Sequence, residues 1–250
     1  MTGELTGRVA LVTGGAGGIG TAICTALAES GASVLVGYAG GEARAQKLAA
    51  RLPGPGAHRA LLARVDDSAT LARAAESVRA LEGRLDLLVN NAGVTAPVPH
   101  ADLDGLGDEL IDTVLRVNVR GAFAAVRACA PLLRASGAGV VVNISSIAGR
   151  TGQGSNVAYC ASKAALDSLT RSLGRALAPE VRVLSVSPGW VDGEYADQMP
   201  PELIAAQAAR TPLGRIARAE EVARAVLAVL THLTFSTGCV IPVDGGRPLG

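Results

Sequence analysis

The chain has 250 residues, 49% of them hydrophobic and 18% charged, and its formal net charge is +1. This composition is typical of a globular protein with one large core, and we expect a single domain over 1–250. The near-neutral charge lacks the basic surface that nucleic acid or an anionic membrane would require, so neither is expected as a partner. A small-molecule substrate is expected instead.

No apolar run is long enough to cross a bilayer, and the first residues lack the basic and apolar segments of a signal peptide, which predicts a cytoplasmic protein. The four cysteines are far apart and lie among apolar or small residues, so we expect buried thiols. The three histidines are also scattered. No metal site is expected.

Short apolar runs alternate with longer segments rich in alanine, leucine and arginine. The expected strands are 8–14, 33–38, 60–65, 85–93, 139–146, 181–189 and 238–246, and the expected helices are 18–30, 41–52, 68–81, 106–135, 156–178 and 219–231. Strands that are apolar throughout and alternate with helices indicate a parallel sheet covered on both faces. The predicted fold class is therefore α/β, a single-domain, doubly wound Rossmann fold with a mostly parallel, seven-stranded sheet.

The stretch VTGGAGGIG, 12–20, closes the first expected strand and opens a helix. Ligands of doubly wound sheets bind at the carboxyl ends of the strands, and glycines let the backbone approach a pyrophosphate at a helix N-terminus. The pattern favours a dinucleotide site. A structural turn without a ligand is the alternative.

Tyr159 and Lys163 are four residues apart in the expected helix 156–178, so they share one helix face. A phenol and an ammonium would then project into the same space. Alone, such a pair is more often a half-buried ring beside a solvated charge.

A series of motifs in a fixed order extends over nearly the whole chain. They are TGxxxGxG from Thr13 to Gly20, NNAG at 90–93, Asn118 in RVNVRGAF, NISS at 143–146, Tyr159-x-x-x-Lys163, and SPG at 187–189. With them the chain resembles the short-chain dehydrogenase/reductases, and most of all the 3-oxoacyl-[acyl-carrier-protein] reductases, which also have its PVDGG ending.

The resemblance implies a catalytic set of Asn118, Ser146, Tyr159 and Lys163. Tyr159 would exchange a proton with the substrate oxygen, and Lys163 would favour the phenolate and bind ribose hydroxyls. Ser146, at the usual spacing before Tyr159, is favoured over Ser145 as the hydrogen-bond partner of the reacting oxygen. Asn118 would complete a water-mediated proton relay to Lys163.

The same resemblance implies a set of cofactor-binding residues. They are Thr13, Gly14, Gly15, Gly17, Gly18, Ile19, Gly20, Gly37, Tyr38, Arg64, Val65, Asn91, Ala92, Gly93, Tyr159, Lys163, Pro188, Gly189 and Val191.

The second expected strand ends at Gly37 and Tyr38 with no acid before Glu42, whereas enzymes that select NAD usually have a carboxylate there. We therefore expect NADP(H) to be favoured over NAD(H), although Gly17 stands where NADP-preferring relatives often have a basic residue. The candidates for contacting the 2′-phosphate are Arg44, Lys47 and Arg64. Arg64 either replaces the acid that many relatives have after the third strand, or marks a slip in register.

The turn-rich segment 189–215 is the expected substrate lid. Gly193 stands where relatives often have a threonine that bonds the nicotinamide amide, so the backbone of Val191 is expected to orient the ring. An acyl carrier protein is a candidate partner, although Glu180 stands where carrier-using reductases have a basic residue.

The expected activity is NADP(H)-dependent reduction of a ketone, 3-oxoacyl or similar, to a secondary alcohol. The alternatives are oxidation of a sugar, polyol or steroid-like alcohol, and a non-catalytic nucleotide-binding regulator. Helices 106–135 and 156–178 carry more apolar surface than one sheet face can cover, and with the last strand they suggest a homotetramer.

Overall fold

The computed structural model describes residues 3–249, so residues 1–2 and 250 of the expected domain lie outside the described residues. One sheet has the strand order β3-β2-β1-β4-β5-β6-β7, and every neighbouring pair is parallel. The strands are β1 (Val9–Val12), β2 (Ser33–Tyr38), β3 (Arg59–Leu62), β4 (Leu87–Asn90), β5 (Gly139–Ile144), β6 (Val181–Pro188) and β7 (Val240–Val243). The predicted Rossmann fold is confirmed.

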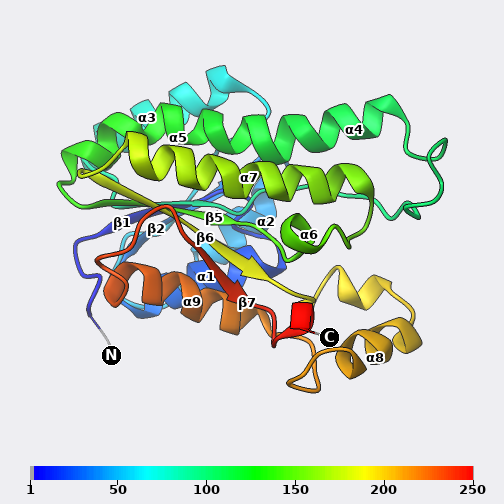
Figure 1. Ribbon diagram of the computed structural model, residues 1–250. Helices are drawn as coiled ribbons and strands as arrows, with labels where there is room; N and C mark the ends of the chain where they lie inside the picture. Colours follow the sequence, from blue (N-terminus) through cyan, green and yellow to red (C-terminus); the bar gives the residue numbers. More distant parts are fainter. Residues whose placement is uncertain (1–2, 250) are drawn as a thin grey trace.

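Helices cover both faces of the sheet (Figure 1). On one face lie α1 (Gly18–Glu29), α2 (Glu42–Ala49) and α9 (Ala219–Thr231). On the other lie α3 (Ser68–Glu82), α5 (Ala122–Ala135) and α7 (Val157–Ala176). The strands are apolar throughout because both faces are covered: Val34 and Val36 pack into one layer of core, and Leu35 into the other.

The expected helix 106–135 is interrupted in the middle. It consists of α4 (Asp108–Leu115), a π-helical turn over Arg116–Gly121, and α5. A π turn widens the helix by one residue and is common at functional sites. Its last residue, Gly121, packs against Val65, since a Cβ there would lie 2.9 Å from Val65 Cγ2. The periodicity of small apolar residues does not reveal this turn.

The order of the strands reverses between β1 and β4, so a cleft opens at the carboxyl ends of these two central strands. Three short elements that were not expected border it. Helix α6 (Ala148–Thr151) lies between β5 and α7, and the segment after β6 contains a 3-10 turn (Ala196–Gln198) and α8 (Pro201–Ala209). Over residues 3–249, none of the helices has the length and apolar character needed to span a membrane.

Candidate active site

The glycine loop between β1 and α1 forms one wall of a cleft of about 1390 Å³. Gly14 has a left-handed backbone (φ +61°), and a Cβ on Gly20 would lie 2.3 Å from the Gly14 carbonyl oxygen. Gly17 is the N-cap residue of α1 and has no side chain to cap the helix, so the first N–H groups of the helix are left for another acceptor. Glycine is therefore required for this turn, and the free N–H groups fit a pyrophosphate.

Most of the expected cofactor residues line this cleft. Those that do are Gly14, Gly17, Gly18, Ile19, Gly20, Gly37, Tyr38, Arg64, Val65, Asn91, Ala92, Gly93, Tyr159, Lys163, Pro188, Gly189 and Val191. Thr13 and Gly15 lie beneath it. The Thr13 hydroxyl accepts hydrogen bonds from the backbone N–H groups of Asn91 and Ala92, both at 3.1 Å, so it joins the ends of β1 and β4.

The helix that carries Tyr159 is fixed at its start by Asn156, which is fully buried. The Asn156 Oδ1 caps α7 by accepting the N–H of Tyr159 at 2.7 Å, and its Nδ2 donates to the carbonyl of Ala96 at 2.7 Å. Sequence analysis missed this residue, although an asparagine three positions before Tyr159 at a helix start is a recognisable capping signal.

The phenol of Tyr159 lies in the cleft close to Ser146. Burial raises the pKa of this phenol to about 12, and a hydrogen bond with Ser146 opposes the shift. Ser145 is instead buried and donates to the backbone carbonyl of Lys163 at 3.4 Å. Of the two serines, Ser146 is therefore the one beside the phenol.

Lys163 lies beneath the Tyr159 ring, with Nζ 5.6 Å from the ring centre. This Nζ donates to the backbone carbonyl of Ile144, at the end of β5, at 2.8 Å. Burial lowers the pKa of Lys163 to about 8. Lys163 was expected to lower the pKa of the Tyr159 phenol. The pKa of Tyr159 is raised instead, because burial is its largest cause of change.

Asn118 lies in the π turn and is buried. Its Oδ1 accepts the N–H of Val94 at 2.8 Å, and its Nδ2 donates to the carbonyl of Val94 and to the hydroxyl of Ser162. Asn118 and Lys163 meet at Gly93, where a Cβ would lie 3.4 Å from Asn118 Oδ1 and 3.8 Å from Lys163 Nζ. The four expected catalytic side chains thus come together around the ends of β4 and β5.

A buried polar network that the sequence did not reveal connects the sheet to α7. Asn90 Nδ2 donates to Asn143 Oδ1 at 2.9 Å, and Asn143 Nδ2 donates to the Thr170 hydroxyl at 2.8 Å. The hydroxyl of Thr170 also bonds that of Ser185 at 2.7 Å. These bonds fix α7 over β4, β5 and β6, and with it the position of Tyr159.

At the other end of the cleft, Gly37 faces β1. A Cβ on Gly37 would lie 2.7 Å from the Val12 carbonyl oxygen, so this position has no room for the carboxylate of an NAD-binding enzyme. The next residue, Tyr38, ends β2 and lines the cleft. Tyr38 is therefore the position at which an acid could reach a ribose.

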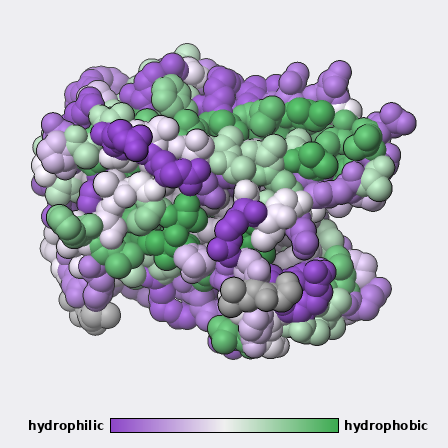
Figure 2. Space-filling model, in the orientation of Figure 1, coloured by the Kyte–Doolittle hydropathy of each residue, from purple (hydrophilic) through white to green (hydrophobic). Residues whose placement is uncertain are grey.

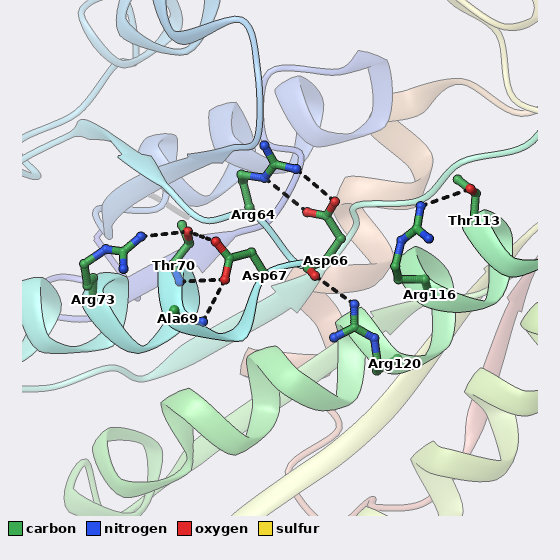
Figure 3. Close-up of polar contacts among 9 residues, drawn as sticks. All are labelled: Arg64, Asp66, Asp67, Ala69, Thr70, Arg73, Thr113, Arg116 and Arg120. Carbon is green, nitrogen blue, oxygen red and sulfur yellow. Dashed lines mark hydrogen bonds and ion pairs between the residues drawn. The ribbon is translucent and has the colours of Figure 1, made fainter.

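Strand β3 ends at Leu62, and Arg64, Val65 and Asp66 all line the cleft beyond it. Arg64 donates to both carboxylate oxygens of Asp66, at 3.3 and 3.0 Å (Figure 3). Arg120, from the π turn, donates to the backbone carbonyl of Asp66 at 2.7 Å. Arg64 and Asp66 therefore lie side by side at the cofactor end of the cleft, where the sequence predicted either an arginine in place of an acid or a slip in register.

The expected lid connects to the cofactor end of the cleft. Glu194 and Arg44 are paired at 3.2 Å across its mouth, and both side chains are exposed. The rings of Trp190 and Tyr195 lie 5.9 Å apart beside this pair. Helix α8 has no buried residue, so few contacts hold the outer part of this segment in place.

A glycine cradle at the switch point of a doubly wound sheet, beside a tyrosine, a serine and a lysine, defines the class of protein: a dinucleotide-dependent oxidoreductase. A model of the family described as Enoyl-(Acyl carrier protein) reductase matches residues 14–247. A protein of Streptomyces violaceoruber, named as a ketoacyl reductase of the granaticin polyketide synthase, is 40% identical, with 96% of each chain covered. The 3-oxoacyl-[acyl-carrier-protein] reductase of Thermotoga maritima is 34% identical, with 97% of this chain and 98% of the relative covered.

Among solved structures, one described as a short-chain dehydrogenase/reductase from Burkholderia xenovorans has a TM-score of 0.91. It is 35% identical in sequence, with 97% of this chain and 98% of the other covered. The chain belongs to the short-chain dehydrogenase/reductase family, and the resemblance read from its motifs is confirmed.

Proposed function

We propose that this enzyme reduces a ketone, 3-oxoacyl or similar, to a secondary alcohol with NADPH, using Tyr159 as the general acid. The observation that carries the proposal is the state of the phenol: with a pKa raised to about 12, Tyr159 holds its proton at neutral pH and can donate it. The relatives named for ketoacyl reduction support the substrate class.

The chain's own residues supply binding, orientation and the proton. The glycine loop and the N-terminus of α1 would hold the pyrophosphate, and Lys163 the nicotinamide ribose. When bound, NADPH supplies the hydride that the carbonyl carbon receives. Ser146 donates a hydrogen bond to the carbonyl oxygen, and Tyr159 Oη transfers its proton to that oxygen. The Lys163 ammonium then offsets the phenolate charge until a proton returns by way of Asn118 and water.

The proposed preference for NADP(H) rests on the cofactor end of the cleft. Gly37 cannot carry an acid without a clash, and Tyr38 is not one. Arg44 and Arg64 line the same end and can meet a 2′-phosphate. Their present partners, Glu194 and Asp66, are held by exposed ion pairs that cost little to exchange.

We also propose a homotetramer. Leu115, Phe123 and Val157 of α4, α5 and α7 are each 37–44% exposed, and Figure 2 shows apolar side chains gathered over these helices. Burying this surface against a second copy would remove it from water. The acyl carrier protein remains a candidate donor of the substrate.

The test is a ketone panel that includes a 3-oxoacyl thioester and cyclic ketones, assayed with NADPH and with NADH. Tyr159→Phe should lose at least about 99% of the rate while NADPH affinity stays within about twofold, since only the transferable proton is removed. A variant that keeps more than a few per cent of the rate would refute the role of Tyr159. Oxidation of alcohols with no ketone reduced would favour the reverse direction.

A further inference from the structure

Asp167 of α7 is a buried carboxylate that no described side chain satisfies. Only 8% of the residue is exposed, and its Oδ1 is sealed from solvent without any hydrogen-bond partner in the part of the chain that the structure describes. A buried carboxylate without partners destabilises a fold. No hydrogen bond of Oδ1 therefore stabilises the fold, which points to a functional role for the carboxylate.

The charged and polar groups around Asp167 have other partners or lie exposed. It borders a cavity of about 360 Å³ between α6, α7, the end of β6 and β7, which is also lined by Arg150, Arg171, Ser187 and Asp244. Arg150 of α6 pairs with Asp244 at 3.7 Å, and Asp244 accepts the N–H of Gly246. Arg171 is exposed on α7, and within residues 3–249 it forms no ion pair with Asp167.

One helical turn separates Asp167 from Lys163, so both side chains lie on one face of α7, and both are buried. Helix α6 seals this face: a Cβ on Gly149 would lie 2.7 Å from the backbone N of Ala164 and from the carbonyl carbon of Lys163. Because both side chains are buried, bulk water screens their attraction less than it would at the surface. Asp167 counteracts the lowering of the Lys163 pKa by burial.

We propose that Asp167 is a positioning residue of the active site, whose negative charge keeps Lys163 protonated beneath Tyr159. This rests on the proposed function of Lys163. Asp167 lies two turns from Tyr159 and one from Lys163, so its charge favours the ammonium more than it opposes the phenolate. The Oδ1 of Asp167 has no hydrogen-bond partner among the described residues, and the proposed role of the carboxylate is to keep the lysine protonated during turnover.

The first test is independent of activity. The NMR signals of the Lys163 side chain, titrated with pH in the wild type and in Asp167→Asn, report the pKa of the lysine directly. We expect the midpoint to fall by about 0.5–1 pH unit in the variant, because one negative charge at close range is removed. An unchanged midpoint overturns the proposal, whatever the enzyme's substrate proves to be.

The second test is the pH profile of kcat/KM for NADPH. In Asp167→Asn the alkaline limb of this profile should move to lower pH by as much as the Lys163 midpoint falls. Asp167→Glu keeps the negative charge, so its alkaline limb should lie at the wild-type pH. The matched control is Asp244→Asn, which removes a carboxylate from the same cavity but from outside α7, and should leave the limb in place.

Thermal unfolding separates this role from a structural one. Asp167→Asn should change the Tm little, since removing a buried charge raises stability while losing its attraction to Lys163 lowers it. A lower Tm with activity reduced equally at every pH would mean that Asp167 serves packing alone. If the wild type reduces no ketone while the lysine midpoint shifts as expected, the proposed function fails and the electrostatic link stands.

Discussion

Lys163 donates its hydrogen bond to Ile144, at the end of β5, and not to the phenol of Tyr159, beneath whose ring its Nζ lies at 5.6 Å. The amine is thus held by the sheet and the phenol by its helix. Because α7 is fixed to the same sheet by a buried network, the two groups keep their spacing without a direct bond. The arrangement leaves the phenol free for a substrate.

Activity should depend on the protonation of Lys163. Since burial lowers its pKa to about 8, we expect kcat/KM for NADPH to fall above that pH as the ammonium is lost. A profile flat to pH ~10 would contradict this, because it would leave Lys163 near its ordinary value.

The same shift has a consequence for stability with a definite sign. The folded pKa of Lys163, about 8, lies below its ordinary value of 10.5, so between these pH values the unfolded chain binds more protons. The contribution of Lys163 to the free energy of unfolding should therefore rise with pH through this window. Denaturant unfolding of the wild type and of Lys163→Met, compared at several pH values, should show this rise in the wild type alone.

Cofactor choice should respond to Tyr38. Tyr38→Asp would place a carboxylate at the end of β2, which accepts a ribose hydroxyl and repels a 2′-phosphate, and should shift preference toward NADH by roughly 1–3 kcal/mol. Tyr38→Phe is the matched control and should keep the wild-type preference. A Gly37→Asp variant is unsuitable, because its Cβ would clash with β1. A wild type that already prefers NADH would contradict the proposal.

Asn156 should affect stability and activity through different atoms. Asn156→Ala removes the cap of α7 and should cost at least about 1 kcal/mol in the free energy of unfolding. Asn156→Asp keeps the capping oxygen but loses the donor to Ala96, so it should recover part of that stability. The rate should be lower than that of the wild type in both variants, because Asn156 fixes the start of the helix that carries Tyr159. Equal stability of the two variants would show that the cap contributes nothing.

Assembly should depend on Phe123. The two phenylalanines of the chain provide a matched pair, since Phe123 lies on α5 and is 40% exposed, whereas Phe235 is fully exposed beyond α9. Light scattering at micromolar concentration should give a tetramer for the wild type and for Phe235→Asp, and a smaller species for Phe123→Asp. A monomeric, active wild type would refute the assembly.

The sequence predicted the sheet and its helices because continuously apolar runs such as 33–38 and 139–146 leave few other interpretations. Most of the residues that border the cleft were implied by the resemblance of the motifs to a known family, and the structure brings them together where the carboxyl ends of β1 and β4 meet. The sequence did not predict the π turn at Asn118, because one extra residue in a helical turn hardly changes the hydrophobic period. The network around Thr170 was also missed, since only the strand order brings Asn90, Asn143 and Ser185 together.

Helices α7 and α8 differ in how firmly they are attached to the rest of the protein. The buried bonds of Thr170 tie α7 to the centre of the sheet, while α8 buries no residue. The two helices therefore belong to different cooperative units, and amide hydrogens of α8 should exchange through local opening while those of α7 await global unfolding. If the segment after β6 is the substrate lid, as expected from the sequence, its outer part can open while α7, which carries Tyr159, stays attached to the sheet.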